Sequence, residues 1–435
     1  MTFRTPSPRN TAARAGAVHA RRTFALAAAL ALCGARMSAQ APVTVADGHL
    51  TLSGQASISV GSNDEGYFNY SSYQYSLLRL LRLDGTADLR VNDHLSVLGD
   101  LQALASVDHG NWLLRPYALF ARIRPWADRP VDIQAGLVPP VFGVFSRRAY
   151  GANDPLVGYP LAYQYLTSLR GNALPATVSD LLAMRGRGWL TRYPIGDTRP
   201  QAGLPVVDGL RYQSGVELHV GSLQPFEAAA SWTSGALSAP SREGGNAGQQ
   251  FSGRFALRPA PGLILGVSGS RGTFLSSSLR DSAAVSDVGD QRAIGFDAEY
   301  SRGHYLVRSE GVYSNSRIPL AVPATRLALA AFGIDVEGRY RITPRLYAAA
   351  RVDRLQFNDV AGPDGPTSWE YPVTRLQVGG GYLVARHTLV KVEWQRNQRD
   401  VTASDVYGGG AYGSQAASAS YNKANLFSAQ LVVWF

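Results

Sequence analysis

LFSAQLVVWF, residues 426–435, carries an apolar side chain at every second position up to its final aromatic residue. The apolar series is Phe427, Ala429, Leu431, Val433 and Phe435. A period of two is the pattern of a β-strand with one apolar face. Chain ends are usually frayed and polar, so a strand that keeps its pattern to the terminal aromatic residue is unusual. By itself the stretch fits both the last strand of a soluble sheet and a strand of a membrane barrel.

The N-terminal segment predicts export. Five arginines between residues 4 and 22 precede the apolar run TFALAAALALCGA (23–35), and Ala39-Gln40-Ala41 has the form of a cleavage site. We therefore expect a signal peptide over residues 1–41 and a mature protein over residues 42–435. Removal of this segment lowers the formal net charge from +10 by six, to +4, which gives no indication of a nucleic-acid partner. The sole cysteine, Cys33, lies in the same segment, so we expect no disulfide in the mature protein.

The stretch LRLDGTADLRV (81–91) alternates in the same way. One face is densely charged, and the other mixes leucine and valine with glycine and alanine. A soluble β-sandwich buries large side chains on its inner face and turns the other face to water. A charged, wet interior and an outside of mixed apolar residues suit a barrel in lipid. The mature chain has no apolar run of the length of a membrane helix, so a membrane role requires a closed barrel.

Sixteen segments of this kind follow one another, joined alternately by short turns and by longer connections rich in Gly, Ser, Asn and Pro. Short turns on one side and long loops on the other are typical of bacterial outer-membrane barrels, and an even number of strands puts both chain ends on one side. We predict an all-β fold, a sixteen-stranded antiparallel transmembrane β-barrel in a Gram-negative outer membrane. The predicted strands are 49–60, 76–91, 95–106, 113–124, 131–138, 211–220, 225–233, 250–258, 263–273, 291–302, 305–314, 327–342, 346–357, 373–384, 388–397 and 422–435.

The end of the chain resembles the C-terminal signature by which outer-membrane β-barrel proteins are recognised for assembly. The matching residues are Phe435, Val433, Leu431 and Phe427. The resemblance implies two partners, the barrel-assembly machinery and outer-membrane lipid. We expect the last strand to pair with HLTLSGQASISV (49–60), so that no open sheet edge faces lipid.

Residues 139–210 lack a sustained period of two, and they fall in the third of the longer connections. The overall plan resembles that of sixteen-stranded porins, whose third external loop folds into the barrel and narrows the pore. We therefore expect a long infolded constriction loop here. YPLAYQYLTSLRG (159–171) predicts a short helix that ends at Gly171, and TVSDLLAMRGRG (177–188) predicts a second helix capped by Thr177 or Ser179.

Charged residues of this loop and of the inward strand faces are the candidate pore lining. The loop carries more arginine than acid, and guanidinium groups attract and grip carboxylate or phosphate. One hypothesis is a basic constriction that favours anions. The alternative is that these arginines anchor the loop to acidic wall residues. The candidates are Arg147, Arg148, Arg170, Arg185, Arg187 and Arg192 in the loop, and Arg82, Arg90, Arg339, Asp84, Asp88, Glu217 and Asp335 on the wall.

The predicted function is that of a porin, which lets small hydrophilic solutes diffuse passively, with no enzymatic activity, cofactor or metal. Resemblance to sixteen-stranded porins implies a homotrimer. VDIQAGLVPPVFG (131–143) also resembles a strand-then-Pro-Phe segment of the phosphate-selective porin O/P family. Those channels carry a lysine cluster, which a chain with only two lysines, Lys391 and Lys423, cannot build. We therefore do not expect phosphate selectivity.

Two other classes of function remain open. A barrel that does not conduct can present its loops as an adhesin or receptor. A rim-site hydrolase would need a base and a nucleophile, and His219, two residues after Glu217, is the best candidate base. No nucleophile motif lies near it in the sequence.

Overall fold

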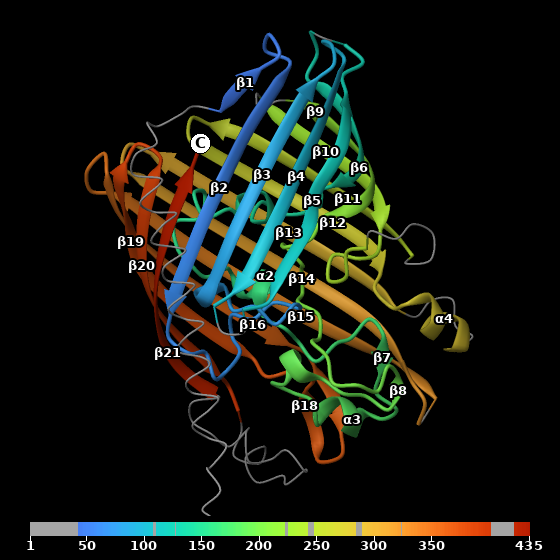
Figure 1. The fold of residues 1–435 in the computed structure, drawn as a ribbon. Coiled ribbons are helices and arrows are strands. Elements are labelled where there is room, and N and C mark those ends of the chain that lie inside the picture. The colour runs from blue at the N-terminus through green and yellow to red at the C-terminus, as the bar shows by residue number, and fades with distance from the viewer. Residues whose placement is uncertain are drawn as a thin grey trace, which may run out of the picture.

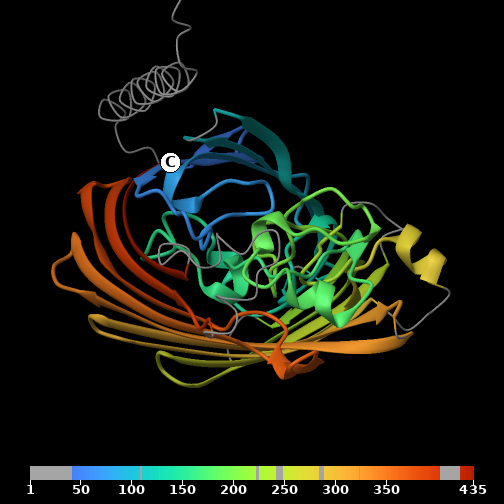
Figure 2. The same ribbon diagram turned by 90° about the horizontal axis from the view of Figure 1, so that it is seen from below.

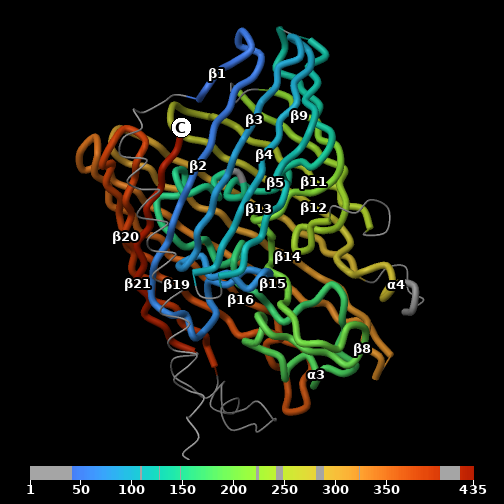
Figure 3. Tube along the Cα trace, in the orientation of Figure 1, coloured from blue at the N-terminus to red at the C-terminus, as the bar shows by residue number. Residues whose placement is uncertain are grey.

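A computed structural model describes residues 42–107, 110–126, 128–221, 225–241, 248–283, 289–322, 324–401 and 422–435. The expected signal peptide lies outside these residues. Sixteen antiparallel strands form one sheet that closes on itself where β2 pairs with β21. Figure 1 shows the barrel from the side, and the tube in Figure 3 traces the blue first strand beside the red last one. The predicted fold class is therefore confirmed.

The barrel strands agree closely with those predicted from the sequence. Their bounds are β2 Leu50–Gly61, β3 Leu80–Arg90, β4 Leu95–Ser106, β5 Trp112–Ile123, β6 Val131–Val138, β9 Gln213–Gly221, β10 Phe226–Ser234, β11 Gln249–Ala260, β12 Leu263–Thr273, β13 Asp290–Arg302, β14 Tyr305–Leu320, β15 Thr325–Arg341, β16 Leu346–Phe357, β19 Val373–Ala385, β20 Thr388–Arg399 and β21 Lys423–Trp434. A further short strand, β1 (Val43–Val45), pairs with the start of β2.

Two strand ends differ from the prediction by four residues or more. Leu77–Arg79 form a 3-10 helix, η1, so β3 starts at Leu80 and not at residue 76. The strand expected over 305–314 continues to Leu320, because each residue from Asn315 to Leu320 has a partner on β15. Pro319 lies near the tip of this hairpin, which made the stretch look like a loop in the sequence.

The outer face of the barrel is apolar and carries aromatic side chains toward both ends of the strands. One exposed group lies toward the short turns: Phe226, Tyr300, Tyr305, Tyr340 and Tyr382. Another lies toward the long connections: Trp112, Trp232, Phe251 and Phe427. Such girdles mark the two membrane interfaces of outer-membrane barrels. No helix among the described residues has the length and apolar character to span a membrane.

Residues 139–212, here called the lumen segment, join β6 to β9. Figure 2 shows this green segment inside the ring of strands. Its elements are short: η2 Ser146–Arg148, α2 Leu161–Gln164, β7 Ala173–Leu174, α3 Val178–Leu182, η3 Gly188–Leu190 and β8 Ile195–Gly196. The elements outside the segment and the barrel wall are α4 Ser277–Ala283 and the hairpin of β17 Asp359–Gly362 with β18 Gly365–Ser368.

Of the two helices expected in the lumen segment, one has the predicted cap and the other is shorter than predicted. Thr177 caps α3 in a capping box with Asp180, as its sequence predicts. The helix expected over 159–171 is shorter in the structure, because α2 ends at Gln164 and the backbone of Tyr165 is already extended. Beyond it, the amide of Thr167 donates to the Leu204 carbonyl at 3.0 Å. A distant partner therefore replaces the helical hydrogen bond there.

Barrel closure generates the first prediction. On the outer face, a Cβ added to Gly54 would lie 2.8 Å from the Phe435 ring and 3.1 Å from the Asp84 carbonyl oxygen. Gly54→Val should therefore lower the free energy of unfolding by about 1–3 kcal/mol through overpacking. The measurement is a urea titration followed by gel electrophoresis without heating, in which the folded barrel migrates as a band separate from the unfolded protein.

The matched control is Gly338→Val on β15, where a Cβ meets no atom within 4 Å. Because valine favours strands, this control should keep or slightly raise stability. Equal midpoints for the two variants would contradict the role assigned to the Gly54–Phe435 contact.

Candidate functional site

Buried charged residues of the inner wall bind the lumen segment. On β3, Arg82 pairs with Asp84 at 2.8 Å and donates to the Ala149 carbonyl at 2.7 Å. Arg82 and Asp84 are 5% and 6% exposed. Both were candidate pore-lining residues, and here they form an ion pair that also holds the segment.

A second group of anchors lies on β16 and β19. Arg351 donates to the Gly158 carbonyl at 2.7 Å, pairs with Asp154 at 2.9 Å and contacts Glu337. Arg375 donates to the Tyr159 carbonyl at 2.8 Å. Each guanidinium group thus replaces water with acceptors from the segment, which a desolvated charge requires.

On β20, Lys391 and Glu393 carry opposite charges, and both bind one turn of the lumen segment. The Lys391 ammonium donates to the carbonyls of Gly151, Asp154 and Leu156 at 2.9, 3.0 and 2.8 Å. The Glu393 carboxylate accepts the amides of Val157 and Gly158, the latter at 3.1 Å. Lys391 is 1% exposed, and its three donors are all used.

These β20 anchors were missed among the candidate site residues. A signal for them exists in KVEWQRNQR (391–399), where every inward position is polar. The inward residues are Lys391, Glu393, Gln395, Asn397 and Arg399, all of them buried. An unbroken polar series that ends up buried needs polar partners opposite it.

The segment packs closely against the wall on this side. A cavity of about 20 Å³ remains between them, lined by residues that include Ser57, Arg82, Asp154, Lys391 and Gln430. This space has room for about one water molecule. This cavity is therefore too small for a solute to occupy.

Buried tyrosines add to the contact on the β14 side. The Tyr163 hydroxyl donates to the Glu310 carboxylate, and the Gly143 amide donates to Ser268 Oγ at 3.0 Å. Burial, followed by the nearby Glu310 charge, raises the pKa of Tyr163 well above its ordinary value. Burial also raises the pKa of Tyr159 to about 12. Both phenols therefore stay protonated and keep donating hydrogen bonds at neutral pH.

Two other long connections join the segment at the mouth of the barrel. Glu370 lies between β18 and β19, and it accepts the amides of Ser168 at 2.8 Å and Tyr371 at 2.9 Å, as well as that of Gly186. Burial raises the pKa of Glu370, although these amides favour the carboxylate. From the 62–79 connection, Tyr67 stacks on Trp189 with ring centroids 3.7 Å apart.

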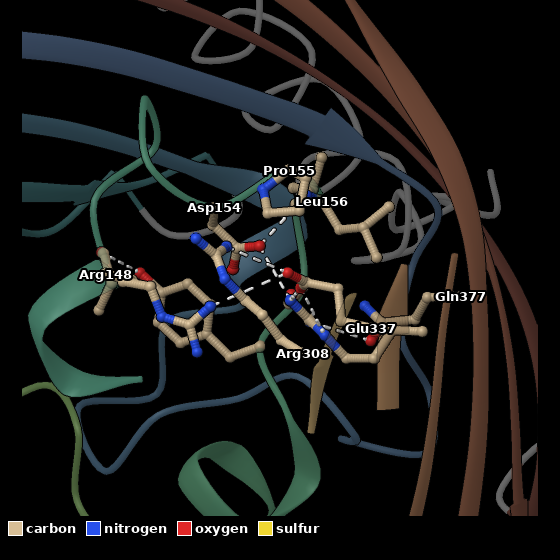
Figure 4. Close-up of polar contacts among 12 residues, drawn as sticks. Arg148, Asp154, Pro155, Leu156, Arg308, Glu337 and Gln377 are labelled. Atoms are coloured by element: carbon tan, nitrogen blue, oxygen red, sulfur yellow. Dashed lines mark hydrogen bonds and ion pairs between the residues drawn. The ribbon is translucent and has the colours of Figure 1, made fainter. Parts of the chain in front are cut away.

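One arginine-rich group remains partly exposed in the lumen. Arg308 pairs with Glu299 at 2.7 Å and with Glu337 at 3.4 Å, and Arg148 lies 4.0 Å from the same Glu337 carboxylate. The side chains of Arg148 and Arg308 are 20% and 16% exposed. Figure 4 shows both guanidinium groups beside Glu337. With Arg351, three cations thus share one carboxylate.

The other loop candidates lie elsewhere. Arg170 donates to Asn172 and to the carbonyls of Thr191 and Arg199, all within its own segment. Arg185 lies over the Tyr371 ring at 4.8 Å, where it ties the segment to the 358–372 connection. Arg187 is half-buried and Arg192 is exposed. The side chain of Arg147 lies outside the part of the chain that the structure describes.

The remaining wall candidates are spread along the lumen. Arg90 is exposed and pairs with Asp93 at a short turn. Arg339 and Asp88 are half-buried, and Asp335 is 9% exposed. The structure therefore brings together Arg148 of the loop with Glu337, Arg308 and Arg351 of the wall. The alternation places these three wall residues inward, but they were not among the candidate site residues.

The hydrolase alternative can be compared with the surroundings of His219 among the described residues. His219 Nε2 lies 3.0 Å from Glu217 Oε2, as the sequence spacing suggested. Ser231 faces Glu217 in the strand register, yet its Oγ has no hydrogen-bond partner in the structure. A serine nucleophile needs an adjacent base in hydrogen-bond contact. No group of metal-ligating side chains occurs among the residues described.

Known proteins share the fold at low sequence identity. Salmonella typhi OmpF, solved in complex with daunomycin, is 12% identical and superimposes with a TM-score of 0.53 over 90% of this chain and 100% of its own. The outer membrane channel DcaP of Acinetobacter baumannii gives 11% identity and 0.51, over 91% of this chain and 100% of its own. An anion-selective porin from Comamonas acidovorans gives 11% identity and 0.50, over 89% of this chain and 99% of its own.

No protein-family profile and no curated sequence matches the chain. The specific resemblance to the phosphate-selective porin O/P family is thus not confirmed. The fold and the residues inside it define the class: a closed, sixteen-stranded barrel of the kind that outer-membrane porins have, with a polar lumen and an inserted segment.

Docking of the lumen segment generates a second prediction. Gly143 has φ +60°, and a Cβ there would overlap the Glu310 carboxylate and the Tyr163 hydroxyl. Gly143→Ala adds about 1–2 kcal/mol of backbone strain in the left-handed region, besides this overlap. We expect trypsin to cut the segment at least about five-fold faster, in line with that strain, as followed by mass spectrometry of the digest in detergent.

Gly151→Ala is the control for this experiment. Gly151 lies in the same segment, but its added Cβ would come no closer than 3.2 Å to a neighbour, Val432. Digestion of the control should match that of the wild type. If Gly143→Ala is digested equally slowly, the segment does not depend on this close approach.

Glu370 generates a pH prediction. Its pKa is raised above the ordinary 4.5, so ionisation costs the folded state more than the unfolded state. The stability due to Glu370 is fully present below about pH 4.5 and is lost as the pH rises through the folded-state pKa. The free energy of unfolding of the wild type, minus that of Glu370→Gln, should fall as the pH rises above about 4.5. Urea titrations measure it, and a difference independent of pH would contradict the assignment.

Proposed function

We propose that the protein is an outer-membrane porin that lets small hydrophilic solutes diffuse passively and prefers anions. The observation that carries the anion preference is the group formed by Arg148, Arg308 and Glu337. Glu337 is shared among three guanidinium groups, counting Arg351, while Arg308 also pairs with Glu299 and Arg351 with Asp154. The side chains of Arg148 and Arg308 keep exposed surface. Guanidinium groups with unused donors attract and align small anions in a narrow, water-filled space.

The lumen segment supports the proposal that only small solutes pass. It is held against β3, β16, β19 and β20. Arg148 of the segment lies near Arg308 of β14 at the shared Glu337 carboxylate, and these two arginines are the proposed lining of the solute path. Its anchors are buried charges with paired donors, which hold the segment in place as a fixed constriction.

The cellular setting is part of the same proposal. The basic and apolar start of the sequence supports cleavage of residues 1–41 on export, and the terminal series ending at Phe435 supports recognition by the barrel-assembly machinery. Outer-membrane lipid is the surrounding solvent, and a homotrimer is the proposed assembly. The protein acts without catalysis and without a cofactor.

Planar-bilayer conductance tests the selectivity. With a salt gradient across the membrane, the wild type should give stepwise conductance and a reversal potential of the sign for anion preference. Arg148→Gln with Arg308→Gln should lower the anion-to-cation permeability ratio by about five- to thirty-fold, since each of the two charges contributes about 0.5–1 kcal/mol across water. Arg292→Gln, an exposed outward arginine on β13, is the control and should leave the ratio unchanged.

The outcomes separate the channel from its selectivity. Conductance without any effect of the double variant retains the porin and removes the role of Arg148 and Arg308. Absence of conductance from folded protein would instead favour a barrel that presents its loops. The tight docking of three long connections at the mouth supports that second candidate.

A further inference from the structure

The outer face of strands β19, β20, β21 and β2 contains an apolar groove of about 640 Å³. These four strands are neighbours in the sheet (Figure 1). The residues at the groove are Val60, Gly61, Val378, Gly379, Val392, Trp394, Phe427 and Ala429, with the adjoining Ser62, Glu393 and Ser428. Val392 and Phe427 are 59% and 61% exposed, so the groove faces the surroundings and not the lumen.

The strand register explains the hollow. One outward row runs across the sheet as Gly380, Val392, Ala429 and Val60, and its members are small or narrow. The next row toward the long connections is Val378, Trp394 and Phe427, with two large aromatic side chains. Small side chains beside large ones leave a channel that a flexible hydrocarbon chain can fill.

Basic side chains lie directly beyond the groove on the same face. Arg396 is exposed and lies two residues after Trp394, a step of about 7 Å along the strand. One row further, Lys423 is exposed on β21 and Arg354 on β16 is paired with Asp400 at 2.7 Å. The rim therefore carries three cations and one acid. They lie toward the long connections, beyond the aromatic row, where a headgroup layer would be.

We propose that this groove and its basic rim form a binding site for a membrane lipid with a phosphate-bearing headgroup. One acyl chain lies in the groove beside Trp394 and Phe427. The phosphate lies against Arg396 and Lys423, since arginine and lysine recognise phosphate and juxtamembrane cations attract anionic lipid. The inference rests on the proposed place of the barrel in a membrane, but not on the anion preference of its pore.

The test is lipid titration of the whole mature protein in detergent, with bound lipids counted by native mass spectrometry. Phosphatidylglycerol is the anionic probe, and phosphatidylcholine is the neutral comparison. We expect one phosphatidylglycerol to bind at least about ten-fold more tightly than phosphatidylcholine. Arg396→Gln with Lys423→Gln should weaken that step by about ten-fold or more, because two rim charges are lost.

Two further variants separate the parts of the site. Ala429→Phe fills the groove and should weaken both lipids, whereas Arg292→Gln, at the same end of the wall on β13, should change neither. Equal affinity for the two lipids, or an equal loss in Arg292→Gln, overturns the proposal. So does an Ala429→Phe variant that binds lipid normally but changes the number of chains in the complex, because the groove would then be an interface between copies.

Conductance keeps this test apart from that of the pore. All four substituted residues lie on the outer face, so the variants should conduct like the wild type. Specific lipid binding by a barrel that does not conduct would contradict the porin function and support the lipid site. Normal conductance without selective lipid binding would support the porin function and contradict the lipid site.

Discussion

The structure depends on one constraint, that a charge removed from water must find a partner. Lys391 and Glu393 meet it with the backbone of a single turn of the lumen segment. The segment has the complementary need, because its backbone groups lie away from water with little regular structure to pair them. Wall charges and segment backbone therefore stabilise each other, and a loss of either would leave polar groups buried and unpaired at a cost of several kcal/mol.

This constraint sorts the arginines of the lumen into two kinds. Arg351 is saturated by Asp154, Glu337 and the Gly158 carbonyl, so it fixes the segment and has little left for a solute. Arg148 and Arg308 share the Glu337 carboxylate with Arg351, and Arg308 also pairs with Glu299, yet both side chains keep exposed surface. Around one carboxylate, the same residue type thus serves both as an anchor and as a candidate anion contact.

The sequence predicted the barrel well and the lumen segment poorly, for a physical reason. Inward and outward alternation is local, so every barrel strand could be located from its neighbours alone. The path of residues 165–170 depends instead on Leu204 and Glu370, which are remote in sequence. Charge counting likewise could not separate Arg170 from Arg148, because the carbonyls that occupy Arg170 come together only in the folded segment.

Three consecutive glycines on β19 connect the inner and outer features of this wall. A Cβ on Gly379 would overlap the Val392 carbonyl on β20, and it would also lie 3.2 Å from the lumen-segment residue Leu156. Gly380 faces outward in the small-residue row of the groove. A Cβ on Gly381 would lie 2.5 Å from the ring of Tyr347, whose hydroxyl donates to the Pro155 carbonyl at 3.0 Å. The glycine run is therefore required by close approach on both faces, which is why the tightest docking inside the barrel and the hollow outside it share the same strand.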